Sequence, residues 1–125
     1  MAIRVLIVDD SMVARLAIKG IIKDTGALVS EAASGEVALE LVEGGLKPDL
    51  VFLDLTMPGM GGFEALKALR ARIPDLKVAI VTADIQVRTV AEVMNNGAFD
   101  VIRKPADRES ILGAMSRASG GSSAS

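Results

Sequence analysis

The sequence predicts an α/β fold built around a five-stranded parallel sheet. Two patterns favour this class. Short apolar runs, typical of strands buried on both faces, recur along the chain, and amphipathic helical patterns alternate with them. The links between these elements are short, which favours successive right-handed βαβ crossovers. The chain has 125 residues, half of them hydrophobic, which is about the size of one domain with a sizeable core.

The first half of the chain contains three predicted strands and two predicted helices. The strands are expected at residues 3–8, 28–33 and 49–53, and the helices at 12–23 and 34–42. Ser11 is a suitable N-cap for the first helix, because its hydroxyl can accept a hydrogen bond from a free backbone N–H. Gly44 and Gly45 end the second helix, since glycine is preferred just after a helix C-terminus.

The second half continues the alternation. Helices are expected at residues 63–73, 87–96 and 108–118, and strands at 77–81 and 100–103. Pro74 stops one helix, Gly97 suits the end of the next, and Asp107 caps the last. Periodicity predicts that the helix at 87–96 is mostly core. We expect one domain over residues 1–119, followed by a flexible Gly/Ser tail at 120–125.

The composition excludes several classes of function. The chain has neither cysteine nor histidine, which removes disulfides, thiolate and imidazole metal sites, and Ser-His or Cys-His catalysis. Any metal must therefore be a hard cation held by oxygen atoms. The net charge of −2 and the absence of a basic run argue against nucleic-acid binding. The first apolar run is too short for a signal peptide or a membrane span, so we expect a cytoplasmic protein.

Polar side chains follow four of the predicted strands. Asp9 and Asp10 end the first, Asp54 the third, Thr82 the fourth and Lys104 the fifth. Because the carboxyl ends of parallel strands share one edge of the sheet, these groups are expected to converge there. Two carboxylates about 5 Å apart repel by roughly 3 kcal/mol at an effective dielectric of about 20. Protonation, Lys104 or a bound cation must relieve that repulsion, and Mg²⁺ suits such oxygen ligands best.

Such a pocket would let one carboxylate attack a phosphoryl group while a metal and an ammonium neutralise its oxygens. Each part has an ordinary alternative when taken alone. An Asp pair after a strand is more often a helix cap or a turn, and Lys104-Pro105 resembles an ordinary loop. The joint occurrence of these parts, in order, at four strand ends argues against the ordinary interpretation.

Five segments carry a resemblance to a known family. They are Val8-Asp9-Asp10-Ser11, Asp54-Leu55-Thr56-Met57-Pro58-Gly59-Met60-Gly61-Gly62, Val81-Thr82-Ala83, Gly97-Ala98 and Lys104-Pro105. Through these five segments the chain resembles the receiver domain of two-component response regulators. The resemblance covers about residues 3–118 and is to the stand-alone, CheY-like receivers in particular. The resemblance implies a flavodoxin-like, doubly wound sheet in the order 2-1-3-4-5, with helices on both faces.

The resemblance assigns the acidic residues unequal roles. Asp54 would be the phospho-acceptor. A Mg²⁺ ion would be held by Asp10 directly, by Asp9 through water, by Asp54 and by the backbone carbonyl of Thr56. The protein would then be no enzyme beyond its own phosphorylation and dephosphorylation.

The remaining pocket residues would contact the phosphoryl group. Lys104 would pair with it, the Thr82 hydroxyl would bind one of its oxygens in the active state, and the backbone N–H of Ala83 would offer another donor. The resemblance also implies a cis peptide bond between Lys104 and Pro105.

The implied function is a signalling switch. A histidine kinase would donate the phosphoryl group from its phosphohistidine, and a downstream protein would bind the face formed by the fourth helix, fifth strand and fifth helix. We expect a monomer that binds neither nucleic acid nor membrane. Chemotaxis is one candidate pathway, but the residues name neither the kinase nor the target.

The sequence departs from the family at two positions. Receivers commonly have Tyr or Phe three residues before the lysine, and this ring swings inward as the threonine moves; here the residue is Val101. An aromatic switch at this position is therefore excluded, and the response would lie in the backbone after Thr82 and in the following helix. Ala106 also stands where a larger apolar side chain is frequent.

Two other functions remain open from the sequence. A Mg²⁺-dependent phosphohydrolase with an aspartyl nucleophile fits the pocket chemistry, although Thr56 occupies the position where many such enzymes place a second Asp. A phosphorylation-independent interaction module, or a receiver cut from a larger regulator, is the third possibility. The intact set of pocket residues argues against the module, and the Gly/Ser tail leaves truncation open.

Overall fold

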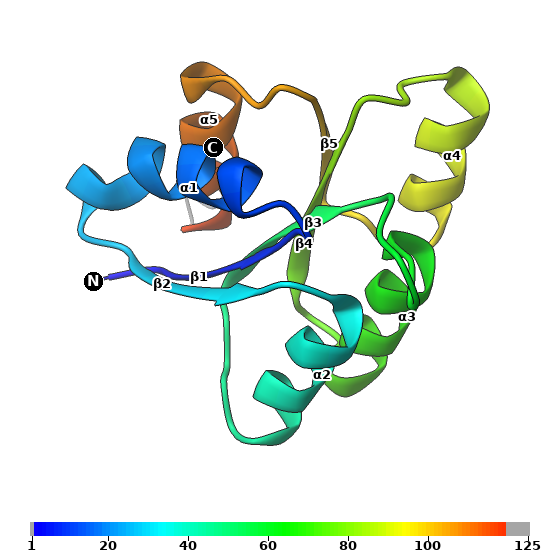
Figure 1. Ribbon diagram of the computed structural model, residues 1–125, viewed down its shortest axis with the longest axis horizontal. Helices are drawn as coiled ribbons and strands as arrows, with labels where there is room; N and C mark the ends of the chain where they lie inside the picture. The colour runs from blue at the N-terminus through cyan, green and yellow to red at the C-terminus, as the bar shows by residue number, and fades with distance from the viewer. Residues whose placement is uncertain (1, 120–125) are drawn as a thin grey trace.

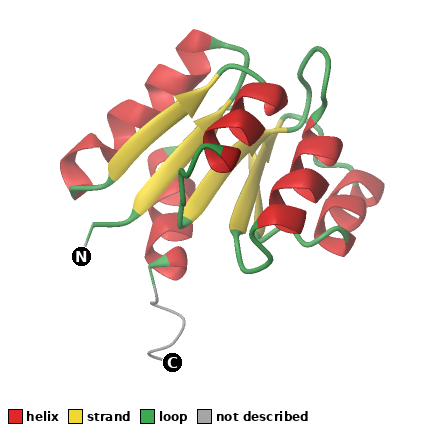
Figure 2. Cartoon of the chain, turned by 90° about the horizontal axis from the view of Figure 1, so that it is seen from below, coloured by secondary structure: helices red, strands yellow, loops and turns green. Residues whose placement is uncertain are grey.

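The computed structural model describes residues 2–119, which form a sheet of five parallel strands. Helices cover both faces of this sheet, as Figure 2 shows. The sheet has the order β2-β1-β3-β4-β5, which confirms the predicted fold and topology. Its strands are β1 (Arg4–Val8), β2 (Leu28–Ala32), β3 (Leu50–Asp54), β4 (Lys77–Thr82) and β5 (Asp100–Arg103). Each lies within one residue of its expected position at either end, and Asp54 and Thr82 belong to their strands instead of following them.

The helices agree with the sequence pattern in number and order. They are α1 (Met12–Ile22), α2 (Gly35–Glu43), α3 (Gly62–Arg72), α4 (Val87–Asn95) and α5 (Arg108–Ala118), and a single 3₁₀ turn, η1 (Lys23–Thr25), follows α1. The hydroxyl of Ser11 and the carboxylate of Asp107 accept backbone N–H groups at the starts of α1 and α5, as expected. Gly97, just after α4, has a φ of 94°, which favours glycine.

Alternation along the strands divides the core into two layers. In β1, Leu6 and Val8 face one layer, and Val5 and Ile7 face the other. The first layer is covered by α2, α3 and α4, and the second by α1 and α5, as can be followed in Figure 1. Both faces of the sheet are therefore buried, which explains why the strands read as nearly continuous apolar runs.

The expectation for α4 was wrong. Val93 is its only buried residue, whereas Val87 is 86% exposed and Met94 is 45% exposed. The cause is the position of the helix: α4 joins β4 to the edge strand β5, so it has less sheet to cover than a central helix has. Apolar periodicity indicated the helix correctly but not how much of it is buried.

Two further expectations concern membrane-spanning helices and the C-terminal tail. Among residues 2–119, no helix is long and apolar enough to cross a membrane. The predicted Gly/Ser tail at 120–125 lies outside the described residues.

Candidate functional site

All seven residues that the sequence analysis assigned to the metal and phosphoryl sites line one cavity of about 300 Å³ at the carboxyl edge of the sheet. They are Asp9, Asp10, Asp54, Thr56, Thr82, Ala83 and Lys104. The strand register brings them together, because Val8 lies beside Leu53 and Asp54 lies beside Val81. The predicted convergence at this edge is therefore present, and Ser11 and Asp84 join the lining.

Three carboxylates form an acidic cluster in this cavity. One oxygen each from Asp9, Asp10 and Asp54 lies within 4.8 Å of the others. At that separation, a charged pair repels by about 3 kcal/mol at an effective dielectric of about 20. Asp9 and Asp54 are buried and Asp10 is exposed, so two of the three charges have lost most of their water.

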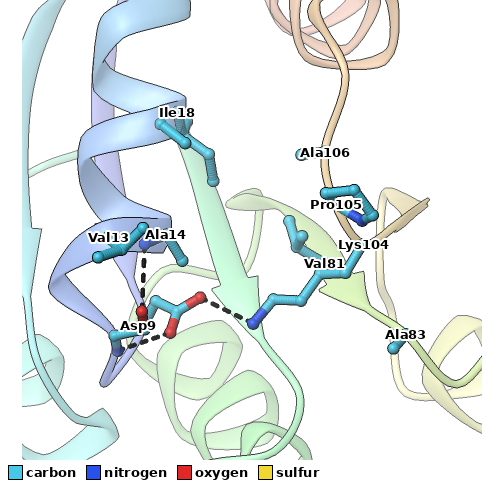
Figure 3. Close-up of a pocket in the computed structure, with 11 residues that line it drawn as sticks. Asp9, Val13, Ala14, Ile18, Val81, Ala83, Lys104, Pro105 and Ala106 are labelled. Atoms are coloured by element: carbon cyan, nitrogen blue, oxygen red, sulfur yellow. Dashed lines mark hydrogen bonds and ion pairs between the residues drawn. The ribbon is translucent and has the colours of Figure 1, made fainter.

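Lys104 holds the two buried carboxylates. Its Nζ lies 3.0 Å from Asp9 Oδ2 and 3.1 Å from Asp54 Oδ1, and Figure 3 shows the contact with Asp9. Burial alone would lower the pKa of the Lys104 ammonium, but the hydrogen bonds to Asp9 and Asp54 outweigh burial and raise that pKa. The Lys104 backbone N–H also donates to the Thr82 carbonyl at 2.9 Å. Lys104 therefore relieves the carboxylate repulsion by direct contact with Asp9 and Asp54, which is one of the three ways that the sequence left open.

The Asp54 carboxylate is ionised at a cost, because it is buried. Burial raises the pKa of the Asp54 carboxyl above its ordinary value. The Lys104 ammonium lowers it and the charge of Asp9 raises it, so burial is not offset. A further cation beside Asp54 would favour the ionised, nucleophilic form.

The loop after β1 is fixed from several sides. The Asp9 N–H donates to the Ala32 carbonyl at 3.1 Å, and Asp9 Oδ1 accepts the Ser11 N–H at 2.9 Å. On the far side, Nη1 of Arg15 donates to the Asp9 carbonyl at 2.6 Å. This loop therefore holds Asp9 and Asp10 on a defined backbone. No sequence pattern indicated the contact made by Arg15.

The loop after β3 depends on a close backbone approach at Gly62. A Cβ placed there would lie 2.5 Å from Leu55 Cα and 2.7 Å from the Asp54 carbonyl oxygen. The Gly62 N–H also donates to the Leu55 carbonyl at 2.9 Å. The first turn of α3 is thus packed directly beneath the backbone that carries Asp54.

Thr82 is linked to α4 through Asp84. The Thr82 hydroxyl accepts the Asp84 N–H at 3.0 Å. The Asp84 carboxylate in turn accepts the Gln86 N–H at 3.1 Å and the Thr89 hydroxyl at 2.8 Å. A displacement of the Thr82 side chain would therefore disturb a short chain of hydrogen bonds that ends on the first turn of α4.

A family model for the response regulator receiver domain matches residues 5–116. The chain belongs to this family. Chemotaxis protein CheY of Listeria monocytogenes is 40% identical over 117 residues, which are 93% of this chain and 98% of that protein. Response regulator GacA of Pseudomonas aeruginosa is 37% identical over 115 residues, which are 90% of this chain but 53% of GacA. The receiver thus resembles both full-length CheY and one part of a longer regulator.

Solved structures agree with this assignment. Chemotaxis response regulator CheY4 of Vibrio cholerae has a TM-score of 0.86 at 29% identity, covering 94% of this chain and 99% of that chain. A CheY-like receiver domain protein of Methanospirillum hungatei has a TM-score of 0.89 at 25% identity, with 100% of both chains covered. The receiver therefore has the flavodoxin-like, CheY-type fold.

The acidic cluster fits the divalent cation that receiver domains generally bind. All three side chains offer carboxylate oxygens, which are ligands that Mg²⁺ prefers. The exposed position of Asp10 leaves one side of the cluster open to water, which Mg²⁺ usually retains in part.

This receiver has no aromatic ring at the position of Val101. Val101 packs against the core layer beneath α2, α3 and α4. Phe99 packs against the other layer, with the Arg117 guanidinium 5.8 Å from its ring centre, so it does not replace the missing ring. The Lys104-Pro105 peptide bond is cis, as the family resemblance implied.

An apolar groove of about 500 Å³ lies beside the acidic cavity of the receiver. Figure 3 shows Val13, Ala14 and Ile18 of α1 on one side and Ala106 on the other, with Asp9 and Lys104 at one end. The small side chain of Ala106 leaves this space open, and the sequence identified the substitution without predicting the groove.

Proposed function

We propose that this receiver accepts a phosphoryl group on Asp54 from the phosphohistidine of a partner kinase, with Mg²⁺ bound. The observation that carries the proposal is the position of Asp54. Its buried carboxylate lines the cavity, 3.1 Å from the Lys104 ammonium, within a cluster of three carboxylates. A nucleophile, a cation for the phosphoryl oxygens and a set of oxygen ligands for Mg²⁺ are therefore present together.

In the proposed reaction, a carboxylate oxygen of Asp54 forms a bond to phosphorus, and the bond from phosphorus to the imidazole nitrogen of the donor breaks. Asp10, Asp54 and the Thr56 carbonyl would hold Mg²⁺ directly and Asp9 would hold it through water, and the bound ion would supply positive charge for the oxygens of the transferring group. Lys104 binds the phosphoryl group through its ammonium, which has three N–H donors and now contacts Asp9 and Asp54.

The Thr82 hydroxyl and the Ala83 N–H then bind phosphoryl oxygens. Movement of the Thr82 side chain toward Asp54 breaks its bond with the Asp84 N–H, and the change passes through the Asp84 carboxylate to α4. With valine at position 101, the response consists of a shift of this loop and helix, not burial of a ring. The phosphoryl group biases a two-state equilibrium that exists before it binds.

The proposed output surface comprises α4, β5 and α5. The exposed side chains of Val87 and Met94 on α4, and of Ile85 just before it, supply apolar contacts for a partner protein. The receiver domain comprises residues 1–119 and acts as a cytoplasmic monomer. Its full-length similarity to a chemotaxis protein makes chemotaxis the first pathway to test.

Acetyl phosphate with Mg²⁺ tests the acceptor. Intact mass spectrometry should show one added phosphoryl group per chain, and Asp54→Asn should abolish it. Asp75→Asn, at an exposed aspartate outside the cavity, is the matched control and should be modified like the wild type. Persistent modification of Asp54→Asn contradicts the assignment, and continued turnover of phosphate esters would identify a phosphohydrolase instead.

A further inference from the structure

Arg15 joins three parts of the molecule behind the acidic cluster. It lies in the second turn of α1, and its side chain is only 14% exposed. Its Nη1 donates to the Asp9 carbonyl at 2.6 Å, and its Nε donates to Glu31 Oε1 of β2 at 3.1 Å. One guanidinium therefore connects α1, the loop after β1 and the neighbouring strand.

We propose that Arg15 is a positioning residue for the metal site, which it serves by fixing the peptide between Asp9 and Asp10. This inference rests on the proposed function, since it concerns the Mg²⁺ that phosphorylation requires. Arg15 itself touches neither the metal nor the phosphoryl group. It binds the carbonyl oxygen of Asp9 and thereby orients the side chain of Asp10.

The contacts of the two acids differ in a way that makes this peptide important. The Asp9 side chain is held independently by Ser11 and Lys104. The Asp10 carboxylate is exposed, and within residues 2–119 it has no hydrogen-bond or ion-pair partner. Its direction therefore depends on its backbone, and Arg15 binds the carbonyl of the peptide from which that backbone starts.

The charges around Arg15 fit an orienting role. Glu31 accepts from Arg15 and also from Lys19, whose Nζ lies 3.0 Å from Glu31 Oε2. The hydrogen bond from Lys19, with that from Arg15, holds the pKa of the Glu31 carboxyl below its ordinary value, so this partner stays ionised at neutral pH. Glu31 thus compensates the partly buried guanidinium, whose charge would otherwise be costly and would repel a cation.

The shape of the guanidinium explains why arginine is suited to this position. Its planar fork presents donors in two directions at once, one to the Asp9 carbonyl and one to Glu31. A lysine ammonium can reach either acceptor but lacks this fixed geometry. Residues that orient metal ligands from behind typically change metal affinity by about 10- to 100-fold when they are replaced.

Calorimetric titration of Mg²⁺ into wild type, Arg15→Gln and Arg15→Lys tests the inference. Arg15→Gln should weaken Mg²⁺ binding about tenfold or more, and Arg15→Lys should fall between it and the wild type. At saturating Mg²⁺, both variants should regain the wild-type rate of Asp54 phosphorylation by acetyl phosphate. Arg72→Gln is the matched control, because it breaks an exposed arginine–glutamate pair between α3 and α2, away from the cavity.

The outcomes separate this inference from the proposed function. Equal Mg²⁺ affinity in wild type and Arg15→Gln overturns the role of Arg15 and leaves the metal site standing. A lower rate at saturating Mg²⁺ with unchanged affinity also overturns it. A wild-type protein that binds no Mg²⁺ overturns the metal site itself and this role with it. If circular dichroism shows that Arg15→Gln is unfolded, the comparison of Arg15→Lys with wild type decides.

Discussion

The acidic cavity and the segment from Thr82 through α4 are held in different ways. In the cavity, buried carboxylates are fixed by Lys104 and by backbone N–H groups, and their strands lie in the middle of the sheet. In α4, Val93 is the only buried residue, and three hydrogen bonds around Asp84 connect the helix to Thr82. A segment with few buried contacts opens at lower free energy than the core. The proposed chemistry therefore lies in a region with many buried contacts, and the proposed response lies in a region with few.

The strongest disruption of the region around the acidic cavity is expected from Gly62→Ala. The added Cβ meets the Asp54 and Leu55 backbone, which cannot move aside as a flexible side chain would. We expect a loss of about 3 kcal/mol in the free energy of unfolding, measured by urea denaturation. Gly20→Ala in α1 is the control: its Cβ meets nothing within 4 Å, so the variant should match or exceed wild-type stability. Equal stability of both variants would contradict the described packing.

Asp54→Asn should stabilise the same region in Mg²⁺-free buffer at pH 7. It removes the repulsion with Asp9 and the burial of a charge, and it weakens one contact with Lys104. We expect a net gain of about 1 kcal/mol, or a rise in melting temperature of roughly 4 °C or more.

The stability gain of Asp54→Asn should depend on pH in a definite direction. The pKa of Asp54 is higher in the folded protein than in the unfolded chain. Protonated Asp54 therefore stabilises the folded wild type fully at a pH below the unfolded-state pKa. That stabilisation is lost as the pH rises through the folded-state pKa. The advantage of Asp54→Asn should therefore be largest above that raised pKa and shrink toward acid pH, as melting curves from pH 7 to pH 4 would show. A gap that widens with acid would refute this account.

Thr82→Ala tests the connection between the two regions. Phosphorylation at Asp54 should persist, because Thr82 is assigned to the response. In wild type, acetyl phosphate with Mg²⁺ should change amide hydrogen exchange in the first turn of α4; in the variant this change should be lost or reduced several-fold. Thr89→Val, which removes the far end of the link, should have a partial effect of about 1 kcal/mol on local opening. An unchanged exchange response in Thr82→Ala would break the proposed route.

The smallest effect on stability is expected at the surface of α4. Val87 is 86% exposed, so Val87→Ser should alter the free energy of unfolding by less than about 0.5 kcal/mol and leave phosphorylation unchanged. If α4 is the output surface, the variant should still show the exchange response in α4 while losing affinity for its target protein. A large loss of stability would instead mean that this side chain is buried in solution.

Local patterns predicted the positions that depend on strand ends. Asp54, Thr82 and Lys104 were found because parallel strands bring their carboxyl ends to one edge, whatever the loops do. Burial on α4 was not predictable in the same way, because periodicity carries no information about whether a helix covers the middle or the margin of a sheet. The pair of Arg15 and Glu31 was also missed, because 16 residues separate two charges that look like ordinary surface groups.

The hydrogen bond from the Asp84 N–H to the Thr82 hydroxyl also has a consequence for noise in signalling. Under the proposed switch, every molecule that reaches the active arrangement must give up this bond, whether or not it is phosphorylated. A bond of this kind contributes about 0.5 to 1.5 kcal/mol, which corresponds to roughly a 2- to 12-fold change in a population. If the proposed switch is correct, this contact between a backbone amide and a hydroxyl lowers by that factor the fraction of receiver molecules that are active without a stimulus.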